Sequence, residues 1–515
     1  MEHPSSVVAA FLEHAERTPD KDCLLFEDES WSYARLRREA LRWAGAYRAA
    51  GVQPGDRIAL YLENSPSFAT AYLGAHLAGA IVVPINTQYR QVELRHILAD
   101  AGARLCVTDV PGRAELARVR PDLPELTLVV TVEVDDGMFL IHADPFEPEP
   151  PDPEAVALIG YTSGTTGRAK GAMLLHRNLA ANARSVTTAW GWTADDRLLL
   201  TLPLFHAHGL CVGLHGTLLV GATADLRRKF EAPEVLDALL AGEATMFFGV
   251  PTMYTRLIAE TERRGTPPGP LRLYVSGSAP LSVQTFEQFE RLFGQPILER
   301  YGMTETIMNL TNPYHGERRP GTVGMPFPGQ EARIVDVRTR QPIEDERPGE
   351  IQVRGPHVFK GYWRNPEATA EVFDPDPDPQ AGTPSRNGGW FNTGDLGWRS
   401  ADGYYTISGR ARELIISGGF NVYPREVEEV LQSHPAVAEA AVLGLPDPDF
   451  GEQVAAAVVL HPGVAATADE LVAHCRDQLA SYKKPRQLFF VESLPRNALG
   501  KVQKHLLKEQ LAPGG

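Results

Sequence analysis

Short apolar runs alternate with helical patterns from Val7 to about Asp144, and this alternation limits the possible folds more than any other feature of the chain. Apolar residues are spaced for helices at Val7 to Leu12 and at Leu36 to Ala50, whereas Arg57 to Tyr61 and Ile81 to Pro84 are short apolar runs. Strands that are interleaved with helices form parallel sheets whose faces the helices cover. The sequence therefore predicts an α/β fold.

The chain has 515 residues, which is too many for a single hydrophobic core. Its pattern changes after Gly321 to short β-like pieces, and from about Arg410 to a compact mixture of helices and strands. We predict a large N-terminal domain, residues 1–409, built from layered α/β subdomains and a β-rich third part. Residues 410–515 are predicted to form a small α+β C-terminal domain.

Two proline-rich stretches interrupt these patterns, because proline cannot occupy a helix interior or a central strand. The first, Pro145 to Pro153, is predicted to be a surface linker that leads into the next strand. The second, Asp374-Pro-Asp-Pro-Asp-Pro379, is predicted to be a solvent-exposed loop, since its like charges repel one another.

Charge and cysteine usage exclude several classes of protein. A net charge of −15 and the lack of a basic tract argue against nucleic-acid binding. The cysteines Cys23, Cys106, Cys211 and Cys475 lie far apart without CxxC spacing, which suits a reducing cytoplasm and indicates neither disulfides nor zinc. The N-terminus has no signal-peptide pattern and no long uncharged apolar window follows, so we expect a cytoplasmic protein without stable membrane insertion.

The segment Tyr161-Thr-Ser-Gly-Thr-Thr-Gly-Arg-Ala-Lys170-Gly171 has the composition of a polyphosphate-binding loop. Its glycines allow backbone N–H groups to approach an anion, its hydroxyls add donors, and its lysine adds a positive charge. It is not a Walker A loop, because Lys170 is followed by glycine and another apolar run. The alternative is a flexible polar hairpin between two strands. The candidate ATP contacts are Thr162, Ser163, Gly164, Thr165, Thr166, Gly167 and Lys170.

Two histidines stand one residue apart in Leu202-Pro-Leu-Phe-His206-Ala-His208-Gly209. In an extended segment they would share a face, where they could bind a metal or line a pocket. A third metal ligand at a recognisable spacing is missing, which favours the pocket.

A threonine and a glutamate are adjacent in Glu299-Arg-Tyr-Gly-Met-Thr-Glu-Thr306, which follows Val275-Ser-Gly-Ser-Ala-Pro280. A hydroxyl beside a carboxylate can hold a phosphate oxygen and its Mg²⁺ ion, because Mg²⁺ is bound through few protein carboxylates. The alternative role of such a pair is a helix cap.

Two more clusters contain a polar residue at a turn or loop. Asp395, in Trp390-Phe-Asn-Thr-Gly-Asp-Leu-Gly, could accept hydrogen bonds from ribose hydroxyls or could simply stabilise its turn. Lys501 follows Gly500 near the C-terminus, where it would be either sterically open for chemistry or an ordinary surface lysine.

The order of these five clusters resembles that of the adenylate-forming superfamily of acyl- and aryl-CoA synthetases, luciferases and peptide-synthetase adenylation domains, from about residue 7 to 510. The resemblance implies ATP, Mg²⁺ and coenzyme A as reaction partners, and a mobile C-terminal domain that rotates about a hinge at Arg412. Arg412-Glu413 stands where the family usually has Lys-Asp. In the first step a carboxylate attacks the α-phosphate of ATP, and positive groups must neutralise the charge that develops.

The resemblance also implies a role for each site residue. These roles are an α-phosphate contact for Thr304, a Mg²⁺ ligand for Glu305, a ribose site for Asp395 and Arg410, a catalytic lysine at Lys501, further ATP contacts at Ser278 and Tyr301, and a coenzyme A channel at Gly418 and Gly419.

Arg300 is the residue that indicates which carboxylic acid the protein would activate. Family members that activate fatty acids have a small or neutral residue here, and a buried arginine without a partner would cost about 3–5 kcal/mol. The sequence motifs around Arg300, His206 and Lys501 most closely resemble those of malonyl-CoA synthetases. This resemblance implies that Arg300 binds the distal carboxylate of a dicarboxylate and that His206 lines the acyl pocket. The alternative is that Arg300 pairs with Glu299 or another internal acid. Ala207 stands where relatives often have a bulkier residue, which suggests space for methylmalonate.

Three functions are compatible with these motifs. The first is an ATP-dependent malonate–CoA ligase, and the second is a medium- or long-chain acyl-CoA synthetase with an open apolar tunnel. The third is a carrier-protein loading enzyme or a non-catalytic nucleotide binder, which the retention of Lys501 disfavours.

Overall fold

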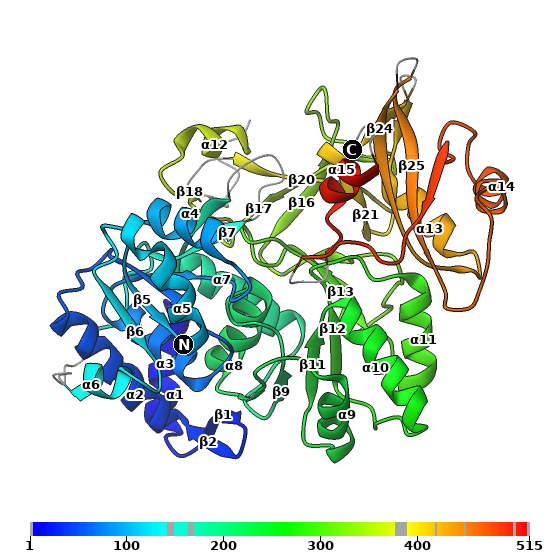
Figure 1. Cartoon of the computed structure of the whole chain (residues 1–515). Helices are drawn as coiled ribbons and strands as arrows, with labels where there is room; N and C mark the ends of the chain where they lie inside the picture. Colours follow the sequence, from blue (N-terminus) through cyan, green and yellow to red (C-terminus); the bar gives the residue numbers. More distant parts are fainter. Residues whose placement is uncertain are drawn as a thin grey trace.

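The computed structural model describes residues 4–141, 149–162, 169–375, 389–417, 420–447, 450–497 and 501–511. The chain forms a large N-terminal domain and a small C-terminal domain, coloured orange to red in Figure 1. The N-terminal domain contains two large mixed sheets and one antiparallel sheet, which confirms the predicted α/β class with a β-rich third part.

The first large sheet has the strand order β18-β8-β7-β4-β3-β5-β6. It is parallel from β7 to β6, and β8 and β18 add antiparallel pairs at one edge. Its strands are β3 (Arg57–Tyr61), β4 (Ile81–Pro84), β5 (Ala103–Thr108), β6 (Leu128–Thr131), β7 (Val156–Thr162), β8 (Lys170–Leu175) and β18 (Gly361–Tyr362). The helices between these strands are α3 (Pro66–Leu77), α4 (Gln91–Ala101), α5 (Val110–Val119), the 3-10 turn Arg120–Asp122 and α6 (Asp136–Ile141).

The second large sheet has the order β15-β14-β13-β12-β11-β9-β10-β1-β2 and is parallel from β13 to β1. Its strands are β1 (Asp22–Phe26), β2 (Glu29–Ser32), β9 (Arg197–Leu200), β10 (Thr223–Leu226), β11 (Met246–Gly249), β12 (Leu273–Ser276), β13 (Leu298–Tyr301), β14 (Leu310–Thr311) and β15 (Met325–Pro326). The associated helices are α1 (Val7–Arg17), α2 (Tyr33–Ala49), α7 (His176–Ala189), the π-helix η2 (His208–Leu214), α8 (His215–Val220), α9 (Ala232–Ala241), α10 (Pro251–Arg264) and α11 (Val283–Phe293).

The third sheet is antiparallel, with the order β16-β17-β20-β19 and β21 beside β20. Its strands are β16 (Glu331–Val335), β17 (Gly349–Arg354), β19 (Phe373–Pro375), β20 (Gly389–Arg399) and β21 (Tyr405–Arg410), and the short helix α12 (Pro366–Glu371) precedes β19.

The C-terminal domain has its own sheet, β23-β22-β25-β24, with β26 parallel to β25. Its elements are the 3-10 turn η3 (Ala411–Glu413), β22 (Ile415–Ser417), β23 (Phe420–Val422), α13 (Pro424–Gln432), β24 (Val437–Asp447), β25 (Gly451–Leu460), α14 (Ala468–Gln478), β26 (Gln487–Phe490) and α15 (Lys504–Leu511). The division at residues 409 and 410 stays a prediction, although β21 ends and η3 begins at this point.

The carboxyl ends of the parallel strands direct several loops to one place. In open α/β sheets these ends form the usual ligand crevice. Here the strands β7, β9, β12 and β13 end at Thr162, Leu200, Ser276 and Tyr301, directly before the motifs that the sequence singled out. None of the helices that the structure describes is long and apolar enough to cross a membrane.

Two segments differ from the sequence-based expectation. His206 and His208 are not in an extended segment, because His206 lies in a bend and His208 begins η2. Of the predicted loop Asp374 to Pro379, the structure describes Asp374 and Pro375, which belong to β19 and pair with β20; residues 376–379 lie outside the described residues. In both cases contacts with distant residues override the local pattern.

A group of buried histidines lies away from these loops, between α3, α7 and α8. The ring of His76 contacts the ring of His176 with centroids 4.8 Å apart, and His215 Nε2 lies 2.8 Å from the hydroxyl of Tyr72. Burial lowers the pKa of His176 to about 4 and that of His215 to about 3. These imidazoles are therefore neutral in the folded protein at pH 7.

We expect acid to destabilise the protein through these histidines. Above the unfolded pKa of about 6.5 their full contribution to stability is present, and it is lost as the pH falls towards their folded pKa values, because the unfolded chain binds more protons. For His176 alone the loss between pH 7 and 4.5 is about 2 kcal/mol. In urea unfolding at several pH values, His176→Gln should show a smaller loss than the wild type; equal losses would contradict this role.

Candidate functional site

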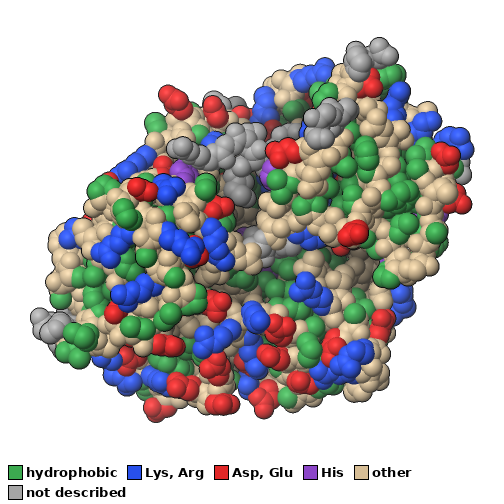
Figure 2. All heavy atoms as spheres, viewed as in Figure 1, with side chains coloured by type: hydrophobic (Ala, Val, Ile, Leu, Met, Phe, Trp, Pro, Cys, Tyr) green, Lys and Arg blue, Asp and Glu red, His purple; other side chains and the backbone are tan. Residues whose placement is uncertain are grey.

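A cavity of about 2170 Å³ lies where the large sheets meet the C-terminal domain, and Figure 2 shows the molecule hollowed at this place. Residues from both domains line it. The predicted site residues in its wall are Thr162, Lys170, His206, Ala207, Ser278, Arg300, Thr304, Glu305, Arg410 and Lys501. The fold therefore brings together side chains that are up to about 340 residues apart in the sequence.

Some of the predicted residues lie outside the part of the chain that the structure describes. They are Ser163, Gly164, Thr165, Thr166, Gly167, Gly418, Gly419 and the side chain of Arg412. Their roles stay predictions.

The candidate phosphate loop connects two antiparallel strands, so the hairpin geometry and the phosphate-binding interpretation are compatible. Thr162 pairs with Lys170 across β7 and β8, and the Thr162 hydroxyl donates to the Lys170 carbonyl at 3.4 Å. The Lys170 ammonium lies 5.2 Å from the ring centroid of Tyr362. The ends of the loop are anchored to α4, since the Tyr161 hydroxyl donates to Asp100 at 2.6 Å and His96 Nε2 lies 2.7 Å from the Ala169 carbonyl.

Thr304 and Glu305 lie in a turn directly after β13 and do not cap a helix. A Cβ atom at Gly160 on β7 would lie only 2.6 Å from Thr304 Cγ2, so glycine at this position lets the turn touch the first sheet. Glu305 is buried and accepts a hydrogen bond from the Tyr362 hydroxyl at 2.9 Å. Burial raises the pKa of Glu305, which a bound cation would oppose.

The surroundings of Glu305 fit Mg²⁺. The ion is held through one or two carboxylates, with phosphate oxygens and water as its other ligands. Glu305 supplies one carboxylate in the cavity wall, whereas the described residues contain no cluster of three His, Cys, Asp or Glu that could form an all-protein metal site. When bound, Mg²⁺ would neutralise part of the phosphate charge.

A strained residue shapes this turn. Ile307 has a φ of +62°, a conformation that a β-branched residue seldom adopts. Asn182 on α7 donates to the carbonyls of Thr306 at 3.3 Å and Met308 at 2.9 Å, on either side of Ile307. Neither Asn182 nor Tyr362 was predicted, because their contacts with the turn span more than 50 residues of sequence.

Asp395 lies behind the cavity wall, where its carboxylate forms an ion pair with one residue and accepts a hydrogen bond from another. Its Oδ1 lies 2.6 Å from Arg410 Nε, and its Oδ2 accepts a hydrogen bond from the Tyr301 hydroxyl. The carboxylate of Asp395 raises the pKa of Arg410, which is a partly buried cation in the cavity wall. Each carboxylate oxygen has a second lone pair, so Asp395 can still accept from a ribose hydroxyl.

Lys501 reaches the cavity from the segment between β26 and α15. Its backbone N–H donates to Asn497 Oδ1 at 2.9 Å, and the Asn497 N–H donates back to the Lys501 carbonyl at 2.9 Å. The nearby Lys504 was not predicted; its ammonium lies 2.6 Å from Glu428 and 3.5 Å from Glu413. Lys504 therefore ties the segment just after the proposed hinge to α13.

Arg300 is buried and points into the other end of the cavity. Its Nη2 donates to the Ser278 hydroxyl at 3.2 Å, while its Nε has no hydrogen-bond partner among the described residues. A Cβ atom at Gly277 would lie 2.5 Å from the guanidinium carbon, so glycine there makes room for this side chain. Burial lowers the pKa of Arg300 to about 9, which leaves the guanidinium charged at pH 7.

The charge of Glu299 opposes the lowering of the Arg300 pKa, but no acid in the described part of the chain forms an ion pair with Arg300. Successive side chains of a strand point to opposite faces, so Glu299 and Arg300 on β13 point away from each other. Glu299 accepts from the Leu281 N–H at 3.1 Å instead, and burial raises its pKa to about 7. Among the residues that the structure describes, no carboxylate oxygen lies within 4.0 Å of Arg300.

The two histidines lie beside Arg300. His208 Nδ1 is 3.4 Å from the Ser278 hydroxyl, and the backbone N–H of His208 donates to His206 Nδ1 at 3.3 Å. Desolvation and then the Arg300 charge lower the pKa of His206 to about 4 and that of His208 well below its usual value. His208 was not among the predicted site residues, although its position in the His-Ala-His motif pointed to it.

Comparison with known proteins shows extensive similarity. The family model described as AMP-binding enzyme matches residues 11–363, and the model of the AMP-binding enzyme C-terminal domain matches residues 426–501. The crystal structure of ATP-bound MatB from Rhodopseudomonas palustris superimposes with a TM-score of 0.90 at 38% identity, covering 98% of this chain and 99% of that one.

Curated relatives of similar identity are named for different acids. A sulfoacetate–CoA ligase from Cupriavidus necator is 36% identical and covers 97% of this chain and 96% of the relative. A long-chain-fatty-acid–CoA ligase from Bacillus subtilis is 33% identical, with coverages of 98% and 95%. A malonate–CoA ligase from Arabidopsis thaliana is 35% identical, with coverages of 98% and 88%. Overall sequence similarity therefore does not show which acid this protein uses as its substrate.

Proposed function

Because the chain belongs to the AMP-binding enzyme family and is an acid–CoA ligase that uses ATP, Mg²⁺ and coenzyme A, we propose that its acid is a small dicarboxylate, with malonate as the main substrate. The reaction would form an acyl-adenylate and pyrophosphate, and then a thioester and AMP. Membership of the superfamily that the motif order resembles is confirmed.

The observation that carries the proposal is the buried, charged Arg300, which has no carboxylate partner within the described ranges of the chain. A buried charge needs a partner, and removing one partner of a buried pair costs about 3–5 kcal/mol. The distal carboxylate of a dicarboxylate would supply the missing partner, and the Ser278 hydroxyl would orient the guanidinium towards it. The names of two relatives support this interpretation, since malonate and sulfoacetate each carry a second anionic group beside the reacting carboxylate.

The remaining site residues have roles that suit the first half-reaction. We propose that the loop from Thr162 to Lys170 holds the departing pyrophosphate, that Thr304 contacts the α-phosphate and that Glu305 binds Mg²⁺. Lys501 would neutralise charge as the carboxylate attacks, and His206, neutral at pH 7, would line the acyl pocket.

A medium- or long-chain fatty acid is the alternative substrate, and the fatty-acid relative favours it. An alkyl chain at this place would leave the buried guanidinium unpaired. Release of AMP from wild-type enzyme with malonate, methylmalonate, acetate and octanoate tests the choice. Faster turnover of octanoate than of malonate would contradict the proposal.

Ala207 is expected to admit a 2-methyl group, so wild-type enzyme should convert methylmalonate as well as malonate. Ala207 lines the cavity between His206 and His208. Ala207→Val should lower kcat/KM for methylmalonate about 10-fold more than for malonate, because a tight pocket discriminates methyl groups by this order. If wild-type enzyme is inactive with methylmalonate where malonate reacts well, this prediction is wrong.

A further inference from the structure

The strand that carries Asp395 leaves the regular sheet just before this residue. Gln352 pairs with Asn392 and Glu350 pairs with Leu396, so β20 advances four residues while β17 advances two. The extra residues bulge from the sheet, with Gly394 at a φ of +70°, where glycine is unstrained. Thr393 and Gly394 line the cavity. The bulge therefore presents backbone to the ligand and aims Asp395 at Arg410.

Side chains from β17 and the bulge itself replace the strand hydrogen bonds that the bulge loses. The Thr393 hydroxyl donates to the Ile351 carbonyl at 2.7 Å and accepts from the Asp395 N–H at 3.1 Å. The Gly394 N–H donates to Glu350 Oε1 at 3.1 Å. A buried N–H group without a partner is costly, so the Glu350 carboxylate stabilises this conformation.

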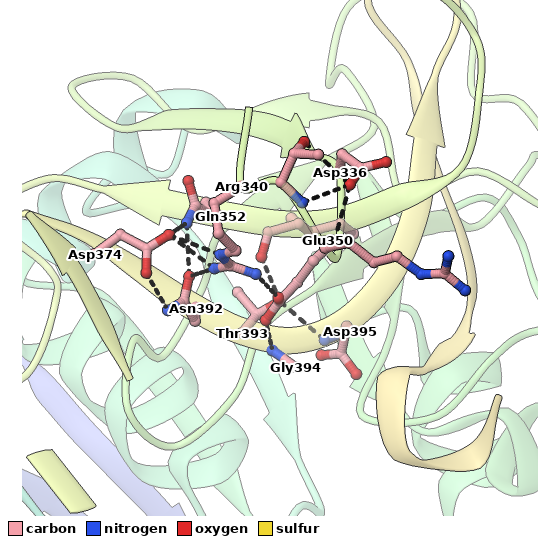
Figure 3. Close-up of polar contacts among 12 residues, drawn as sticks. Asp336, Arg340, Glu350, Gln352, Asp374, Asn392, Thr393, Gly394 and Asp395 are labelled. Carbon is pink, nitrogen blue, oxygen red and sulfur yellow. Dashed lines mark hydrogen bonds and ion pairs between the residues drawn. The ribbon is translucent and has the colours of Figure 1, made fainter. Parts of the chain in front are cut away.

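Arg340 holds Glu350 in place. As Figure 3 shows, its guanidinium lies between Glu350, Asp374 and Asn392, which come from three different strands. Arg340 Nε donates to Asp374 Oδ2 at 3.0 Å, and its other nitrogens contact Glu350 and Asn392. Gln352 closes the network with bonds of 2.6 Å to Asp374 and to Asn392.

The backbone of Arg340 is also held in an unusual conformation. Its φ is +61°, which lies in the left-handed region that non-glycine residues seldom adopt. Asp336 stabilises this turn by accepting from the N–H groups of Arg338 at 2.9 Å and Thr339 at 2.8 Å. Such strain is characteristic of places where a side chain must point in one direction.

We propose that Arg340 and Glu350 are positioning residues for nucleotide binding, which act by fixing the Thr393 to Asp395 bulge. This inference rests on the proposed function of Asp395 as the ribose ligand. Arg340 and Glu350 line the cavity beside Thr393 and Gly394, and they act on the nucleotide through this bulge, whereas the acid is bound at Arg300. Their loss should therefore weaken ATP and AMP and leave the acid unaffected.

The test compares full-length variants by AMP affinity, measured by calorimetry, and by KM for ATP and for malonate. Arg340→Met and Glu350→Ala should weaken AMP binding about 10-fold and raise KM for ATP similarly, since each weakens or removes the charge-assisted hydrogen bond from the Gly394 N–H that fixes the bulge. Glu350→Gln should recover most of the affinity, because its amide oxygen can still accept from Gly394. Arg338→Met is the matched control, since Arg338 is on the same turn with an exposed side chain.

The result that overturns the inference is an AMP affinity of Arg340→Met within about twofold of that of Arg338→Met. The inference would also be overturned if Arg340→Met weakened AMP binding, raised KM for malonate and lowered the melting temperature together. Such a result would indicate a general disruption of the fold. The variant Asp395→Asn tests the proposed ribose contact separately from the positioning role of Arg340 and Glu350. If it binds AMP normally, the proposed ribose contact is wrong; if it binds weakly while Arg340→Met binds normally, only the positioning role is wrong. Should Glu350→Ala not fold, Arg340→Met and Glu350→Gln decide.

Discussion

Replacing Arg300 with methionine is expected to lower kcat/KM for malonate about 10- to 100-fold, which corresponds to the loss of one bidentate charge-assisted interaction. Methionine retains most of the apolar volume of the arginine side chain, so the buried site should remain filled. Because Arg300 has no carboxylate partner in the part of the chain that the structure describes, its removal should not leave an unpaired acid behind. Activity with octanoate should fall far less or rise. The measurement is AMP release with each acid.

Arg184→Met provides the matched control for this experiment. Arg184 is a partly buried arginine that donates to the Pro4 carbonyl at 2.9 Å and is not in the cavity wall. The control should leave the ratio of malonate to octanoate turnover unchanged. Equal losses for the two acids in Arg300→Met would show that this residue does not select a dicarboxylate.

Lys501→Ala is expected to reduce formation of the acyl-adenylate about 100- to 1000-fold, which is the usual effect of removing one preorganised group that stabilises developing negative charge. Lys501 is in the cavity wall together with Thr304, Glu305 and Arg300, so this arrangement suits the adenylation step. Transfer of a preformed malonyl-adenylate to coenzyme A should change little. Pyrophosphate release measures the first step, and thioester formation from the adenylate measures the second.

The exposed Lys229, which pairs with Glu231 at 2.8 Å, gives the control variant Lys229→Ala, and both half-reactions should keep their rates in it. A Lys501→Ala enzyme that loses both half-reactions to the same degree would contradict a specific role in adenylation.

The sequence predicted the fold class and the parts of the site that are local in the chain. The loop after β7 and the turn after β13 each have their signal within a few residues of sequence. Such signals work because turn chemistry, capping and strand ends depend on neighbouring residues.

Residues that act on the site from a distance were not predictable in this way. Asn182 holds the turn at Ile307 across more than 120 residues, and the charge run that begins at Asp374 suggested a solvated loop although this carboxylate pairs with Arg340. Their residue types are ordinary for surface helices and loops. Only the packing of separate elements brings Asn182 to the turn at Ile307 and Asp374 to the cavity.

By itself, the sequence determined the class of reaction, because five local motifs, each ambiguous alone, stand in the order that is typical of one superfamily. Whether Arg300 has an internal partner was decided only by the tertiary structure. Two residues adjacent in sequence, Glu299 and Arg300, could have formed a pair, but the alternation of side chains along β13 places them on opposite faces. The fold leaves the guanidinium buried, charged and free to meet an anion, and this physical state of a single side chain underlies the proposed choice of substrate.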